Sequence, residues 1–150
     1  MTTDMHSASV MGKDLSISTK QAIVISKYIR GKKLSWVKER LGKVLEFEVA
    51  VPFTVRKKGI GHRKGHMSSG RYPQKATKEV MKLIKSVEAN AQNKGLDTNE
   101  LYISEIIPNK ASRPRHPGRQ LGTRMRRTHL EIIVEERIKE KKTENKEKKK

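Results

Sequence analysis

The stretch PQKATKEVMKLIKSVEANAQNKG, residues 73–95, carries the clearest helical pattern in this chain of 150 residues. Pro73 suits the first turn of a helix, and Gly95 suits its C-terminal end. Between them, apolar side chains recur every three or four positions and so share one face. These residues are Ala76, Val80, Leu83 with Ile84, Val87 and Ala91. The stretch therefore predicts a long amphipathic helix that buries this face against other elements.

Two shorter helices are predicted before it, separated by Gly31, which suits a left-handed helix end. The face of the first carries Ala22, Ile25 and Ile29. The second carries Leu34, Val37, Leu41, Val44 and Leu45. A short strand at residues 15–17 is expected to lead into the first helix.

From Leu101 the apolar period changes to two, which is typical of strands. Leu101, Ile103 and Ile107 are expected on one face of a first strand. In a second strand Thr128, Leu130, Ile132 and Val134 alternate with His129, Glu131, Ile133 and Glu135. The carboxylates at 131, 135 and 136 are interpreted as a solvated face rather than a catalytic pair.

Between these strands, residues 108–127 contain no carboxylate and seven cationic residues, too long a connection for an ordinary hairpin loop. The cations are Lys110, Arg113, Arg115, Arg119, Arg124, Arg126 and Arg127. If Leu101 lies opposite Val134, the midpoint falls between Pro117 and Gly118, which suit a type II turn. The segment then predicts a hairpin that projects roughly 30 Å from the core and binds phosphates through its arginines.

Residues 55–72 form a second basic segment, with four glycines and no acid. Neither its glycine spacing nor GHMSSGRY (residues 65–72) matches a nucleotide-binding motif. His62 and His66 lack a third metal ligand. We expect a pliant loop that binds RNA, the alternative being a disordered basic loop. The expected contacts are Arg56, Lys57, Lys58, His62, Arg63, Lys64, Arg71 and, in the following helix, Lys75.

The composition is strongly basic and limits the kinds of partner that the chain binds. Its 35 Lys+Arg against 16 Asp+Glu give a net charge of +19. Such a charge requires a polyanionic partner, with nucleic acid ahead of an anionic membrane surface. There is no cysteine, no apolar run long enough to span a bilayer and no signal-peptide pattern, so we expect a cytosolic protein. No constellation for catalysis and no cofactor motif is found, so no enzyme is expected.

Several blocks of the chain have a familiar order: ISTKQAIVISKYIRGKKL from Ile17, VPF from Val51, GHRKG from Gly61, residues 69–97, and PRHPGR and THLEIIVEE from Pro114 and Thr128. Over about residues 15–136, these blocks resemble the universal large-subunit ribosomal protein family that is numbered twenty-two in bacteria, in its archaeal and eukaryotic branch. The chain departs from that family at His116 and Pro117, where alanine and a non-proline residue are usual, and in a shorter arm over residues 107–114.

The resemblance implies an α+β fold with three helices packed on a small antiparallel sheet, a long protruding β-hairpin and a basic C-terminal tail. It implies binding to large-subunit rRNA, contacts with neighbouring large-subunit proteins, and a hairpin tip that lines the nascent-peptide exit tunnel. Carried over by position, the tip is Arg115, His116, Pro117, Gly118 and Arg119. The expected organisation is a flexible segment over 1–14, one rRNA-binding domain over 15–136 and a lysine-rich disordered tail over 137–150.

Two other functions stay open at this level. A DNA-compacting protein would insert a hairpin arm into the minor groove, but the PRHPGR tip supplies no large apolar wedge. An RNA-processing enzyme would need acids or a metal cluster, and neither is found in the sequence. We therefore expect no membrane or DNA partner.

Overall fold

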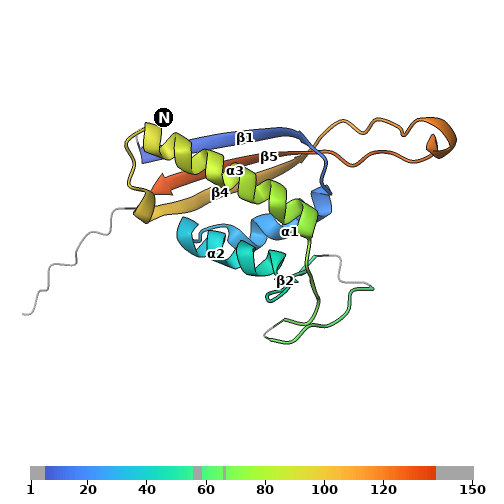
Figure 1. Cartoon of the computed structure of the whole chain (residues 1–150), viewed down its shortest axis with the longest axis horizontal. Helices are drawn as coiled ribbons and strands as arrows, with labels where there is room; N and C mark the ends of the chain where they lie inside the picture. The colour runs from blue at the N-terminus through green and yellow to red at the C-terminus, as the bar shows by residue number, and fades with distance from the viewer. Residues whose placement is uncertain (1–5, 56–58, 66, 138–150) are drawn as a thin grey trace, which may run out of the picture.

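The structure is a computed structural model that describes residues 6–55, 59–65 and 67–137. A three-stranded antiparallel sheet of order β1-β5-β4 is covered on one face by helices α1, α2 and α3 (Figure 1). The strands are β1 (Ser7–Leu15), β4 (Leu101–Lys110) and β5 (Thr128–Glu136), and the helices are α1 (Thr19–Ile29), α2 (Leu34–Leu45) and α3 (Gln74–Asn93). The predicted α+β fold of three helices on a small antiparallel sheet is confirmed. All but the first residue of the tail expected over 137–150 lies outside the described residues.

Strand β1 corrects the expectation of a flexible segment over 1–14, because residues 7–14 belong to the sheet. It pairs with β5 from Ser7 opposite Glu135 to Leu15 opposite Thr128. Its two buried residues, Ala8 and Gly12, are small, and a Cβ at Gly12 would lie only 2.9 Å from the Leu83 side chain of α3. Small residues therefore let α3 approach the sheet. Because they are neither β-branched nor large, a prediction based on the pattern of large apolar residues does not detect this strand.

The apolar faces predicted for the three helices form the core. Helix α3 packs on β1 and β5, α1 packs on β4, and α2 packs on α3. Val80, Ile84 and Val87 are fully buried there, whereas Leu83 is only partly buried at the edge of the core. No helix in the described part of the chain combines the length and the apolar composition needed to cross a membrane.

A second, smaller cluster lies where the basic segment over residues 55–72, here called the Gly-rich loop, leaves the core. Val24, Val44, Val51 and Phe53 are buried together. Strands β2 (Val51–Pro52) and β3 (Gly70–Arg71) pair beside them and bring the two ends of the loop side by side. The loop therefore leaves the core from a fixed base.

Strand β4 departs from strict alternation. A bulge between Ile103 and Glu105 inserts an extra residue, so Ile106 rather than Ile107 joins Leu101 and Ile103 in the core. The expectation for Ile107 was therefore wrong. Before β4, the short 3-10 helix η2 (Thr98–Glu100) connects the strand to α3.

The connection between β4 and β5, residues 111–127, extends past the end of the sheet (orange in Figure 1). Leu101 lies opposite Glu136 rather than Val134, so the expected register was wrong by two residues. The two arms are joined by backbone hydrogen bonds from His116 N to Thr123 O (3.2 Å) and from Met125 N to Pro114 O (2.9 Å). The turn consequently lies farther along the chain than expected.

That turn contains the 3-10 helix η3 (Gly118–Gln120), with Gly118 at a φ of +65°. Leu121, which follows η3, is 53% exposed. The extra length of the bulged strand and the extension of β5 to Glu136 shift the centre of the turn from between Pro117 and Gly118 to between Arg119 and Gln120. The turn therefore includes an exposed apolar side chain, unlike the PRHPGR tip expected from the sequence.

Candidate nucleic-acid interface

The N-termini of α1 and α3 carry lysine instead of the usual acid. In the first turn of each helix there is no acidic residue, and Lys20 and Lys75 occupy that turn. The N-cap side chain of Ser18 accepts no hydrogen bond from α1. Because a helix N-terminus has unpaired N–H groups and a partial positive charge, a cation there is unfavourable unless an anion binds nearby. Both ends therefore suit phosphate groups.

Two buried hydroxyls attach the start of α1 to the base of the β4–β5 connection. The Thr128 hydroxyl lies 2.9 Å from the Thr19 hydroxyl and donates to the Ile17 carbonyl at 3.1 Å. Since both threonines are buried, these bonds hold the entry into α1 beside the base of β5. The arginines that precede Thr128 are thereby placed next to the N-terminus of α1.

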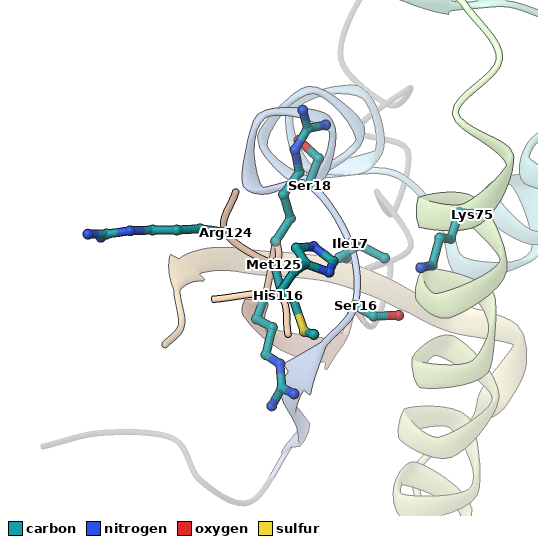
Figure 2. A pocket seen from close by; sticks show the side chains of 9 residues that line it. Ser16, Ile17, Ser18, Lys75, His116, Arg124 and Met125 are labelled. Carbon is teal, nitrogen blue, oxygen red and sulfur yellow. The ribbon is translucent and has the colours of Figure 1, made fainter. Parts of the chain in front are cut away.

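An open hollow of about 520 Å³ lies at this junction (Figure 2). Residues 16–18 form one side, Lys75 comes from α3, and His116 and residues 124–127 come from the two arms of the connection. Two neighbouring hollows also include Ser18, and they add Lys20, Arg71 and Arg113. Among the residues that the structure describes, no carboxylate lines any of the three.

We call this surface the cationic groove. Its cations are Lys20, Arg71, Lys75, Arg113, Arg124, Arg126 and Arg127. They come from α1, from β3 with the adjacent start of α3, and from the connection between β4 and β5, which are three segments far apart in the sequence. With arginine forks, lysines and two helix N-termini around it, the groove is chemically suited to several phosphates of a folded polyanion.

The structure brings six of the predicted RNA-binding residues together in this groove: Arg71, Lys75, Arg113, Arg124, Arg126 and Arg127. Arg115 and Arg119 are exposed farther out on the connection, as are Pro117 and Gly118, while Lys110 is exposed at the end of β4. His116, expected at the tip, is half-buried and lines the groove instead (Figure 2). Arg56, Lys57 and Lys58 lie outside the described residues.

The Gly-rich loop places its remaining predicted residues on the surface. His62, Arg63 and Lys64 are exposed, and the Arg63 guanidinium lies 5.3 Å from the centre of the Tyr72 ring. A Cβ at Gly70 would lie 3.0 Å from the Arg63 side chain, so this glycine permits the close approach. Among the described residues no group of three metal-ligating side chains occurs, and His66 lies outside them.

Ion pairs between described residues lie away from the cationic groove. Lys33 donates to Glu100 at 2.8 Å, and this hydrogen bond raises the pKa of Lys33 above its usual value. On α2, the hydrogen bond from Lys43 lowers the pKa of Glu39. The acids of the helices thus neutralise cations near α2 and η2 and leave the groove positive.

Sequence reasoning missed Ser18 and Lys20 as parts of the interface. The available signal was the absence of acid after a serine N-cap, which is unusual for a helix start. The proximity of α1 to the arginines over 124–127 carries no local signal, because more than 100 residues separate Thr19 from Thr128. Only the folded chain brings them together.

Comparison with known proteins identifies the family. The family model described as "Ribosomal protein L22p/L17e" matches residues 10–135. Among similar proteins, each named large ribosomal subunit protein uL22, that of Methanococcus vannielii is 40% identical and covers 86% of this chain and 89% of its own length. That of Methanopyrus kandleri is 39% identical and covers 89% of both, and that of Archaeoglobus fulgidus is 38% identical and covers 89% and 91%. The matched residues run from within β1 to within β5 and include the three helices and the cationic groove, and the chain belongs to the ribosomal protein L22p/L17e family.

Proposed function

We propose that this chain is a structural constituent of the large ribosomal subunit and binds large-subunit rRNA through the cationic groove and the Gly-rich loop. The observation that carries the proposal is that seven cations and two acid-free helix N-termini lie on one surface, to which no carboxylate of the described ranges contributes. Release of counterions from rRNA phosphates supplies affinity, and the fixed arginines set the orientation. Membership of the family supports the same function.

In this proposal the β4–β5 connection reaches into the subunit and lines the nascent-peptide exit tunnel. Arg115 and Arg119 bind rRNA, and the exposed Leu121 side chain contributes an apolar surface at the turn. The partners are rRNA, neighbouring large-subunit proteins and the nascent peptide, and the location is the cytoplasmic ribosome. The protein catalyses no reaction, requires no cofactor or metal, and has no membrane or DNA partner.

The test has two measurements on the full chain. Expressed with an affinity tag, the chain should co-sediment with large subunits on a sucrose gradient. The purified chain should bind structured large-subunit rRNA with a logarithmic affinity that falls linearly with the logarithm of salt concentration. Each phosphate contact should add roughly 0.7 to 0.9 to that slope.

Replacing Arg71, Lys75 and Arg126 by glutamine should lower the salt slope by roughly two to three. A matched variant with Lys78, Lys82 and Lys85 of α3 replaced by glutamine loses the same charge outside the cationic groove and should retain most of the slope. Equal loss in both variants would refute the groove as the binding surface. Preference for duplex DNA over rRNA at matched salt would favour the architectural DNA-binding alternative.

A further inference from the structure

The sheet has a second face that no described element covers. Helices α1 and α3 pack on β4, β5 and β1 from one side (Figure 1). Along β5, alternate residues are buried under these helices, and the residues between them are half-buried on the opposite face. A solvated sheet face normally carries polar side chains, so its composition indicates whether it meets a partner.

Strand register places rows of side chains on this open face, with Asn109 opposite His129 at one end and three rows beyond them. Met11, Glu131 and Ile107 form one row across β1, β5 and β4. Ser9, Ile133 and Glu105 form the next, followed by Ser7, Glu135 and Tyr102. We call the apolar and acidic members of these rows the acidic sheet face: Met11, Tyr102, Glu105, Ile107, Glu131, Ile133 and Glu135.

Apolar side chains on this face remain accessible. Met11 is 51% exposed, and Tyr102, Ile107 and Ile133 are half-buried although none of the described helices covers them. Because exposed apolar groups gathered on one sheet face cost free energy in water, this group is typical of a surface that a partner covers. The β4 bulge contributes to it by turning Ile107 away from the core.

The negative charge of the acidic sheet face indicates which kind of partner it binds. Glu105, Glu131 and Glu135 lie on neighbouring positions of β4 and β5, and no ion pair between described residues includes them. In a chain of net charge +19, this face would repel the phosphates that the cationic groove attracts. A ligand with apolar and cationic side chains, in contrast, would bury Met11 and Ile133 and pair with the carboxylates.

One arginine already occupies the rim of this face. The Arg137 guanidinium lies 5.2 Å from the centre of the Tyr102 ring, an arrangement that stabilises a cation over an aromatic face. This contact shows how the face receives an arginine side chain. Lysine and arginine side chains also pack their methylene stems on apolar surface while their charged ends reach a carboxylate.

Resting on the proposed function, we propose that the acidic sheet face docks a Lys/Arg-rich polypeptide segment of a neighbouring large-subunit protein. The segment lies across β1, β5 and β4, with apolar side chains against Met11, Ile107 and Ile133 and cations beside the three carboxylates. The chain's own residues 138–150 fit the charge but contain a single apolar residue, Ile138. They do not match the apolar part of the face.

Crosslinking in assembled subunits tests this proposal. A photoreactive benzoylphenylalanine replaces Met11 in the full chain, and a control chain carries it at Ser86, which is exposed on α3. Large subunits are purified on a sucrose gradient, irradiated and digested, and the crosslinked peptides are sequenced by mass spectrometry. We expect position 11 to crosslink to a lysine- or arginine-rich segment of another large-subunit protein, and position 86 not to reach that segment.

Neutralising the carboxylates of the acidic sheet face is the second part of this experiment. Replacing Glu105, Glu131 and Glu135 together by glutamine should lower the yield of that crosslink about tenfold, since three ion pairs with the docked segment are lost. Replacing Glu39, Glu46 and Glu48 by glutamine makes the same charge change on and after α2 and should leave the yield unchanged. Gradient recovery of each variant separates loss of docking from loss of folding.

The outcomes separate the two proposals. If the unsubstituted chain does not co-sediment with large subunits, the proposed function fails and this inference fails with it. If it co-sediments but position 11 crosslinks only to rRNA, only to residues 138–150 or to nothing, the docking proposal alone is refuted. The same follows if the yield is equal in the two glutamine variants.

Discussion

At the scale of single residues, adding a side chain should change the free energy of unfolding in opposite directions at Gly31 and Gly42. Gly31 follows α1 at a φ of +73°, whereas Gly42 lies within α2, and a Cβ added at either position would have open space around it. Gly31→Ala should lower the free energy of unfolding by about 1–2 kcal/mol because of the left-handed backbone. Gly42→Ala should raise it by about 0.5–1 kcal/mol through helix propensity. Urea denaturation of the full chain measures both, and changes of the same sign would contradict this reasoning.

At the scale of the element, α1 has one lysine in its first turn and one in its last, Lys20 and Lys27. Lys20→Glu should raise the free energy of unfolding by about 0.5 kcal/mol, because an anion replaces a cation at the positive helix end, while rRNA affinity falls about tenfold. Lys27→Glu makes the same charge change at the other end and should lower stability by a similar amount, with a much smaller loss of affinity. Thermal denaturation and filter binding test the pair. Equal losses of rRNA affinity would show that only net charge matters.

At the scale of the whole molecule, the groove and the distal connection should have separable roles. Deleting residues 112–123 removes Arg113, Arg115 and Arg119 but leaves the helices, the sheet and most of the groove, so the variant should still enter large subunits while altering arrest or passage of a nascent peptide. Replacing Arg63, Lys64 and Arg71 by glutamine should instead weaken incorporation severalfold, because these cations lie beside the folded core. Quantification in purified subunits and stalling on an arrest peptide distinguish the two effects. Loss of incorporation only in the deletion variant would reverse the assignment.

Local periodicity was sufficient to predict α3 and β5. Val80, Ile84 and Val87 recur at helical spacing, and Leu130 and Val134 lie at even spacing on one face of β5, so their buried faces follow from the local sequence alone. The same local information predicted the acid-free basic segments that supply most of the groove. Periodicity failed for β1, whose buried residues Ala8 and Gly12 are small and whose Gly12 lies close to α3.

Amino-acid order by itself therefore determined the helices, the burial of β5 and the positive charge that requires a polyanion. The tertiary structure decided which cations lie together in the cationic groove and which carboxylates lie together on the acidic sheet face. The Thr19–Thr128 contact joins the N-terminus of α1 to the arginines before β5, and the bulge in β4 brings Ile107 into line with Met11 and Glu131. Both juxtapositions depend on pairing between distant strands, where inserting one residue changes the face that each following side chain occupies. Such long-range register is a property of the packed sheet and cannot be read from any single segment.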